Sequence, residues 1–516
     1  MTRPSDRSPP LSTPQATALA AACALLQGAP AVAAAPEPAA DTAVTIYSSA
    51  RPGAIPPEYY RPLPGQGTPN AMGVPGYAMV RQERPVELQR GRSQVRFTDV
   101  AALIDPTTVT FTSLTDPAAR VLEQNFQFDL VSTDKLLLKF IDQPLTVERA
   151  LPGGATTTTT GTLLSSVDGL VLRGADGNIT ALRDYSALRF PDLPGGLITR
   201  PTLLWDLSSD RAGTHRARVT YQTGGITWWA DYNLIFNEGR DAGNGAVDLS
   251  AWVSIINQSG ATFENAKLKL IAGDVNRVEP PRMLRMEAMA TARVADGGFQ
   301  EQSFDEFHLY TLGRQTTLPN NSTKQIELFD QARRVPAQRT LVYASNTQFG
   351  GGRYENAAFP FTGSSKVDTY LSFQNDAASG LGVPLPAGRI RVSRLDPADG
   401  SLEFIGEDAI GHTPRNERVR IRLGSAFDVV GERRQMDFRI DSQARWMEEE
   451  IEVTLRNHKE EAVEVQVREF MYRWSNWEML SRSQEFERED ARTILFRAQV
   501  PADGSRTVRY RVRYSW

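Results

Sequence analysis

The chain has 516 residues, of which 41% are hydrophobic and 23% are charged. At about 150 residues per domain this length corresponds to roughly three domains, and the composition excludes a disordered or membrane-embedded chain. Its 57 basic and 61 acidic side chains give a formal charge of −4, so the sequence lacks the basic excess of a nucleic-acid-binding protein. Four histidines and one cysteine exclude a thiolate metal cluster and a disulfide framework.

The first 35 residues are predicted to be a secretory signal peptide. Arg3 and Arg7 supply a basic start, residues 16–26 are rich in Ala and Leu, and the small residues at 31–35 match a cleavage site. The alternative is an Ala- and Pro-rich tail. Cleavage would remove Cys23 and leave a mature chain without cysteine, stabilised by packing alone. We therefore expect a periplasmic or secreted protein, because no later run reaches the ~20 apolar residues of a membrane-spanning helix.

Alternation of apolar and polar residues with period two runs from Ala78 to the end of the chain. This pattern predicts antiparallel sheets that have one face in solvent. The clearest example is 508–516, where the even-numbered residues are apolar and arginines stand between them. The runs 451–455 and 463–467 predict a strand pair joined by the polar turn 457–461.

Short sequence echoes predict repeated modules. Three alternating strands end at Asn257, Asn375 and Asn457, and a polar turn and another strand follow each. Asn suits such turns because it tolerates left-handed geometry and bonds to nearby backbone. A second echo places Pro319 and Pro501 directly before a strand. Immunoglobulin-like sandwiches in series would produce both echoes.

Several segments interrupt the strands. Residues 52–75 are rich in Pro and Gly and are expected to form an irregular loop. Residues 132–141 are predicted to form a short helix capped by the first serine, and 156–160 a low-complexity tip. Closely spaced short strands between 161 and 190 predict a small barrel. Residues 279–295 are the second helical candidate.

The predicted fold is therefore mainly β, with serial antiparallel, immunoglobulin-like β-sandwich modules, a small inserted β-barrel and a few short helices. The expected parts are a signal peptide at 1–35, an N-terminal β domain at 36–200 with the Pro-rich loop 52–75 and the barrel insert at about 141–190, a middle β-sandwich at 201–345 with a mobile or helical insert at 279–316, a β-sandwich module at 346–425, and a C-terminal β-sandwich at 426–516.

No motif identifies a catalytic, cofactor-binding or metal site, and we predict none. Ser132 and Lys135 match the Ser-x-x-Lys nucleophile motif, but its Ser-Asp-Asn and Lys-Thr-Gly partners are missing, and helix capping explains Ser132 better. The four histidines lie in separate segments without a His-Glu-x-x-His pair. Carboxylates are abundant, but their spacing singles out no acid/base pair.

Four tryptophans are the candidate partner-binding residues: Trp228, Trp229, Trp474 and Trp477. Adjacent strand residues point to opposite faces, so at most one of Trp228 and Trp229 can lie in the core. Trp474 and Trp477 have arginines nearby, at 468, 473 and 482, which could stack on the indoles. The alternative is a structural ladder of aromatic side chains that protects a sheet edge.

Ten short stretches spread over nearly the whole mature chain carry a resemblance to a known family: 95–100, 104–107, 121–125, 221–232, 265–268, 272–275, 385–388, 455–458, 472–474 and 510–516. They resemble the bacterial domain of unknown function 4139 family, also seen as the C-terminal part of mucoidy-inhibitor-A-like proteins. The Pro-rich loop looks like an insertion into the first strand region of that family. The resemblance implies an exported, β-rich envelope protein and transfers no catalytic residue.

Together these features predict an exported cell-envelope protein that is a non-enzymatic scaffold or binding module for protein or glycan partners. The alternative is an envelope hydrolase that acts on glycan or peptide through carboxylates brought together between domains. A purely structural role in the envelope is a third possibility.

Overall fold

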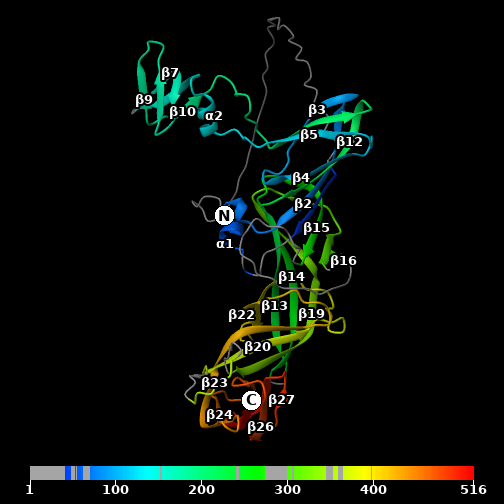
Figure 1. Cartoon of the computed structure of the whole chain (residues 1–516), viewed down its shortest axis with the longest axis vertical. Helices are drawn as coiled ribbons and strands as arrows, with labels where there is room; N and C mark the ends of the chain where they lie inside the picture. Colours follow the sequence, from blue (N-terminus) through cyan, green and yellow to red (C-terminus); the bar gives the residue numbers. More distant parts are fainter. Residues whose placement is uncertain are drawn as a thin grey trace, which may run out of the picture. The chain divides into compact units, whose positions relative to one another are not determined.

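The computed structural model describes residues 41–47, 53, 55–61, 70–151, 154–239, 243–273, 299–304, 307–344, 352–357, 364–396 and 398–516. For 299–304 it describes the backbone alone. The described chain is mainly β, as predicted, and its strands form several multi-stranded sheets (Figure 1). Its helices are short: α1 (Pro57–Tyr60), α2 (Thr133–Lys139) and the 3-10 turn η1 (Ala71–Gly73). No helix in these ranges is long and apolar enough to cross a membrane.

The N-terminal part contains two sheets that share a core. The larger sheet has the order β16-β17-β15-β1-β2-β12-β4, with β18 paired to β15, and the smaller has the order β3-β11-β5. Their bounds are β1 Asp41–Tyr47, β2 Tyr77–Leu88, β3 Gly91–Thr98, β4 Ile104–Ser113, β5 Arg120–Gln127, β11 Thr202–Ser209, β12 Gly213–Thr223, β15 Phe263–Ala272, β16 Phe299–Phe304, β17 Phe307–Leu312 and β18 Thr316–Leu318. Phe97 and Phe111 pack on the buried Trp205 between the two sheets.

The insert beyond α2 is an open sheet, so the prediction of a small barrel is wrong. Its order is β10-β6-β7-β8-β9, and within the described ranges no pairing joins the end strands β9 and β10. The bounds are β6 Pro144–Ala150, β7 Thr156–Ser165, β8 Leu170–Arg173, β9 Ile179–Leu182 and β10 Ala187–Arg189. End strands of four and three residues provide few ladder bonds, whereas a closed barrel needs staggered pairing all around.

Two further predictions for this insert have different outcomes. The expected low-complexity tip at 156–160 is the first half of β7 and pairs with β6, because Thr is a good strand former. The predicted short helix is confirmed as α2. Ser132 caps it by accepting a hydrogen bond from the Lys135 backbone N–H.

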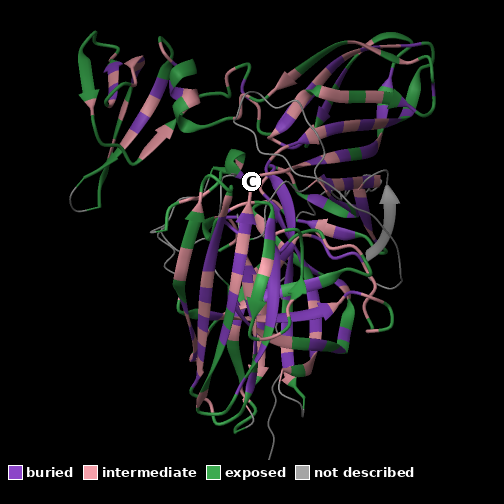
Figure 2. Cartoon of the chain, turned by 60° about the horizontal axis from the view of Figure 1, so that its bottom comes forward, coloured by how far each residue is buried: buried purple, intermediate pink, exposed green. Residues whose placement is uncertain are grey.

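The C-terminal half is built on one sheet of 13 strands. Its main path is β22-β21-β13-β14-β19-β20-β23-β24-β29-β26, and β25, β27 and β28 pair beside that path. The bounds are β13 Ile226–Glu238, β14 Asn244–Asn257, β19 Ser322–Ala344, β20 Lys366–Gln374, β21 Gly388–Leu395, β22 Leu402–Ile410, β23 Arg418–Asp441, β24 Trp446–Asn457, β25 Val463–Phe470, β26 Trp477–Arg482, β27 Glu487–Arg488, β28 Thr493–Val500 and β29 Gly504–Ser515. Buried and accessible residues alternate along these strands (Figure 2).

Strand pairing runs across the expected module borders. β19 ends at Ala344, just before the 345/346 border, and pairs with β20, which lies beyond it. The 425/426 border falls inside β23. The core is nevertheless divided, because a separate cluster of buried residues fills the C-terminal module. The helical candidate at 279–295 lies outside the described residues, and two parts of the expected 279–316 insert, Phe299–Phe304 and Phe307–Leu312, form β16 and β17.

The predicted pairing of 451–455 with 463–467 is wrong. β24 pairs with β23 and β29, whereas β25 pairs with β19 and β28. The apolar sides of β24 and β25 meet in the C-terminal core, so the turn between them links two layers of a sandwich. Alternation had identified the buried face of each strand correctly, but it carries no information about the neighbouring strand. The predicted buried face of β29 is confirmed at Val508, Tyr510, Val512 and Tyr514.

The predicted sequence echo at Asn257, Asn375 and Asn457 corresponds to one repeated contact. Each asparagine is at most 1% exposed; Asn257 and Asn457 end β14 and β24, and Asn375 directly follows β20. Each side-chain amide donates hydrogen bonds to two kinds of backbone carbonyl. One lies in the turn that follows the asparagine, at Ala261, Val383 or Glu461, and the other lies in a distant turn, at Leu318, Pro414 or Pro501. The three turns are therefore fastened in the same way.

The proline echo belongs to the same contact, and the structure adds a third copy. The carbonyls of Pro319, Pro414 and Pro501 accept hydrogen bonds from the three asparagines. Two residues after each proline the backbone has positive φ, at Asn321, Asn416 and Asp503. Asn and Asp tolerate this left-handed geometry, so a Pro-x-Asn/Asp turn starts β19, β23 and β29.

Candidate functional site

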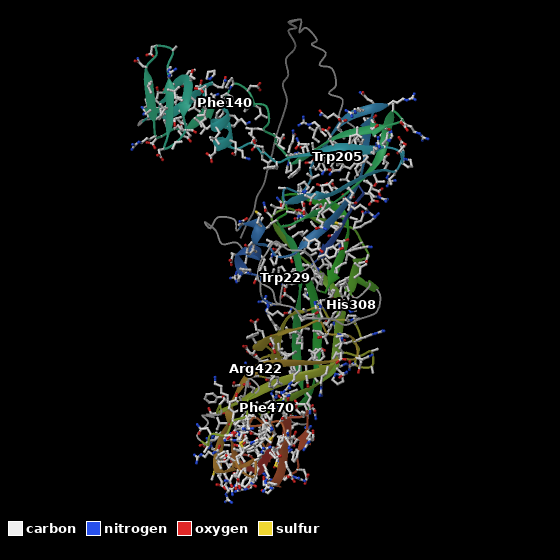
Figure 3. The ribbon with its side chains drawn as sticks, in the orientation of Figure 1. Phe140, Trp205, Trp229, His308, Arg422 and Phe470 are labelled. Atoms are coloured by element: carbon white, nitrogen blue, oxygen red, sulfur yellow. The ribbon has the colours of Figure 1, made fainter. Side chains whose placement is uncertain are left out.

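The adjacent residues Trp228 and Trp229 lie on opposite faces of β13. Trp228 is 2% exposed, belongs to the large core, and donates its indole N–H to the Ile271 carbonyl at 3.2 Å. Trp229 is 8% exposed and packs on the other face against Ile55, Val74 and Ile256 (Figure 3). Neither ring offers an open surface to a partner.

The face that carries Trp229 extends over five neighbouring strands, and we call it the Asp231 face. Its strands are β22, β21, β13, β14 and β19, in that order. The pairing register places these side chains on it: Trp229, Asp231, Asn233, Ser250, Trp252, Ser254, Gln325, Glu327, Arg389, Arg391 and Glu407. The opposite side of β14 is core, with Val253 and Ile255 buried.

Asp231 is the centre of this face. One carboxylate oxygen accepts the Trp229 indole N–H at 2.6 Å and the Ser254 hydroxyl at 3.1 Å. The other oxygen lies 3.3 Å from the Arg389 guanidinium and 3.5 Å from that of Arg391. Its side chain is only 9% exposed, so the four donors replace most of its water. Burial lowers the Arg389 pKa, but the Asp231 carboxylate and Tyr60 together outweigh burial, so the Arg389 pKa is raised.

Trp252 is the open aromatic residue of the Asp231 face. It is 37% exposed, the most exposed of the eight tryptophans, all of which lie in the described ranges. In the ladder it stands directly opposite Asp231 on one side and Glu327 on the other. Trp252 was not predicted as a site residue, although the inward alternation of Val253 and Ile255 implies that Trp252 points outward.

The described parts of the β1–β2 connection, residues 55–61 and 70–76, cover one end of this face. The Tyr60 ring lies 5.6 Å from the Trp229 ring, tilted by 50° to it, and Tyr60 also lies beside the Arg389 side chain. The Gln258 side-chain amide donates a hydrogen bond to the Tyr59 carbonyl at 3.4 Å. Tyr47 and Tyr77 pair directly at the base of the connection, where a short turn would be enough to join β1 to β2.

Trp474 and Trp477 lie in the C-terminal module and are largely enclosed. Trp477 donates its indole N–H to the Ala491 carbonyl at 2.9 Å, and the Arg488 guanidinium lies 4.2 Å from its ring centre. The Arg353 guanidinium lies 5.8 Å from the Trp474 ring. Guanidinium–indole contacts therefore occur, but through these two arginines and not through those at 468, 473 and 482 that the sequence analysis named.

Two buried ion pairs stabilise the same module. Glu449 accepts hydrogen bonds from Arg473, Tyr472 and Tyr514, all between 2.7 and 3.1 Å. Glu469 accepts from Arg433 at 2.9 Å and from Tyr510 at 2.6 Å. Burial, and then the nearby carboxylate, raise the pKa values of these tyrosines, which keeps the hydroxyls protonated as donors. This cluster has the ionisable groups of an active site, but it is enclosed in the core.

A serine–histidine contact lies where the β4–β5 and β11–β12 turns meet. The Ser113 hydroxyl is 3.1 Å from His215 Nδ1, and His215 Nε2 is 3.2 Å from the Arg211 carbonyl. Asp116 bonds instead to Ser209, which is the main cause of its lowered pKa. A nucleophilic triad needs a carboxylate on the far nitrogen and an accessible hydroxyl, whereas Ser113 is 3% exposed. The cluster holds the two turns together. Its residues come from segments far apart in the sequence, so no local pattern predicted it.

The described residues contain no group of three or more His, Cys, Asp or Glu placed to hold a metal ion. A shallow pocket of about 520 Å³ opens between β4 and β5 and is lined by 109–111 and 119–124. Its lining includes a single carboxylate, Glu123.

No family model matches the chain, and no curated protein matches its sequence. The resemblance to the domain of unknown function 4139 family stays a prediction.

Proposed function

We propose that the chain is an exported, non-enzymatic scaffold or binding module of the cell envelope that holds a protein or glycan partner on the Asp231 face. The observation that carries the proposal is the exposed Trp252 beside the ordered cluster of Asp231, Arg389 and Arg391. Tryptophan and arginine are the residues on which binding energy concentrates, and a rigid sheet holds them in place without a large ordering cost.

Other clusters among the described residues support binding over catalysis. The ionisable clusters at Glu449 and Glu469 are enclosed in the C-terminal core, and each carboxylate is neutralised by an arginine. The Ser113 hydroxyl is buried under two turns. A hydrolase would require free carboxylates beside an open cleft, and the pocket between β4 and β5 offers Glu123 alone. Export is supported by the signal-like sequence of residues 1–35.

Site-specific crosslinking tests the proposal. The mature chain would carry no cysteine, so Asn233→Cys gives one labelling position on the exposed middle of the Asp231 face. Glu478→Cys, exposed on β26, is the matched control outside that face. Both proteins are labelled with a photo-crosslinker and irradiated with envelope extract.

The expected result is a discrete adduct from position 233 that is absent from position 478 and is lost when Trp252→Ala is added. Protease and glycosidase digestion of the adduct distinguish a protein from a glycan partner. Equal labelling at both positions, or an adduct that survives Trp252→Ala, would contradict the proposal.

A further inference from the structure

The segment that covers one end of the Asp231 face shows which chemistry this face accepts. The Tyr60 ring lies 5.6 Å from the Trp229 ring at an interplanar angle of 50°, and Tyr60 also lies beside Arg389. Arg389 in turn bonds to Asp231, which also accepts the Trp229 indole N–H. At the covered end, an indole, an arginine and a carboxylate therefore form a binding position for a ring that carries a hydroxyl group.

The same components continue into the open part of the face. Trp252 lies on the strand next to Trp229, one ladder position along, and stands opposite Asp231. The Trp252 indole is 37% exposed. Two exposed amide side chains lie near it: Asn233, two residues after Asp231 on β13, and Gln325, two residues before Glu327 on β19. The open part is thus continuous with an interface that the chain already forms with its own Tyr60.

Charge and backbone pairing narrow the class of ligand. Asp231 is neutralised by Arg389 and Arg391, and Arg391 also lies 3.6 Å from Glu407, so the ionised groups in the middle of the face are paired with one another. The exposed carboxylate directly opposite Trp252 is Glu327, which would repel an anionic ligand and can accept hydrogen bonds from hydroxyl groups. The other polar groups beside Trp252 are neutral amides and hydroxyls. β13 and β14 each pair with a strand on both sides, so an extended peptide cannot join the sheet at this point.

From these contacts we infer that the open part of the Asp231 face binds a neutral glycan, with one sugar ring stacked on Trp252 and its hydroxyl groups bonded to Asn233, Gln325 and the Asp231–Arg389 pair. Sugar rings present a C–H face to an indole and hydroxyl groups at their rim, and the tilted Tyr60 ring likewise brings C–H groups to Trp229 and a hydroxyl-bearing ring beside Arg389. This inference rests on the proposed function, because it names the partner class of the same face.

Binding of the mature protein to immobilised oligosaccharides tests the inference. The neutral probes are chito-, cello-, malto- and manno-oligosaccharides. A carboxymethylated polysaccharide, which is a polyanion, is the charged probe. The variants are Trp252→Ala, Trp252→Phe, which keeps a ring, and Trp446→Ala. Trp446 is a partly exposed tryptophan of the C-terminal module that stacks with Arg513 and serves as the matched control. Unchanged thermal unfolding of each variant confirms its fold.

The inference predicts binding to at least one neutral chain, weakened about tenfold or more by Trp252→Ala, weakened less by Trp252→Phe, and unchanged by Trp446→Ala. It is overturned if no neutral chain binds, if only the polyanion binds, or if Trp252→Ala binds as well as the parent protein. A protein adduct from position 233 combined with a negative glycan panel would overturn the glycan inference and leave the proposed function intact. Absence of both would overturn both.

Discussion

Replacement of Asn457 by Ala should destabilise the C-terminal module strongly, because this side chain is 1% exposed and makes three hydrogen bonds to backbone. Its amide donates to the Glu461 carbonyl at 2.8 Å and the Pro501 carbonyl at 2.9 Å, and its oxygen accepts from the Lys459 N–H at 3.0 Å. At about 0.5–1.5 kcal/mol for each bond, the free energy of unfolding should fall by roughly 1.5–4.5 kcal/mol.

Urea unfolding of the mature protein, followed by tryptophan fluorescence, measures this loss. Asn457→Asp keeps the acceptor but turns a carboxylate oxygen toward two carbonyls, so it should be at least as destabilising as Asn457→Ala. Asn476→Ala is the control, because Asn476 is exposed and bonds only to the Ser515 hydroxyl. The control should lie within about 0.5 kcal/mol of the parent. An Asn457→Ala variant as stable as the control would refute the account of the repeated turn.

Three other outcomes follow from the structure. Truncation before Val508 should unfold the C-terminal module in a melting experiment, because four large buried side chains of β29 are worth about 6–12 kcal/mol; an unchanged profile would disprove this. Arg433→Met should cost about 3–5 kcal/mol by leaving Glu469 charged and unpaired, and adding Glu469→Leu should restore most of it; equal loss in both variants would count against the ion-pair account. A hydrogen bond from Arg218 holds the Glu83 pKa below its ordinary value of 4.5, so the stability it provides is present above that pH and disappears as pH falls through the folded-state pKa. Glu83→Gln should therefore be less stable than the parent at pH 7 and converge with it in acid, and parallel stability curves would show that Glu83 is not the group involved.

The sequence predicted the β class, the buried faces of strands and the repeated asparagines because each of these is a local pattern. Alternation specifies which side of a strand is buried, as at Val508 and Tyr510. The turn asparagines were visible because each is followed at once by a polar turn, although their amides also bond to proline carbonyls 39 to 62 residues further along the chain. The third proline, Pro414, follows the same pattern and was overlooked.

Features that depend on distant strands were not predictable in this way. Both β24 and β25 alternate correctly, yet only long-range packing places them in different layers. The Asp231 cluster joins Trp229 to Arg389 across parallel strands that are far apart in the sequence. Trp229 was predicted as a binding residue but lies under Tyr60 in the structure, because a motif shows residue type but not exposure.

The most direct test of the Asp231 face as the binding surface is oxidative footprinting of tryptophan side chains in the mature protein, with and without envelope extract. The account predicts that Trp252 becomes protected in the bound state while Trp446 is oxidised to the same extent as before. If a partner binds and Trp252 stays as reactive as in the free protein, the binding surface lies elsewhere on the molecule.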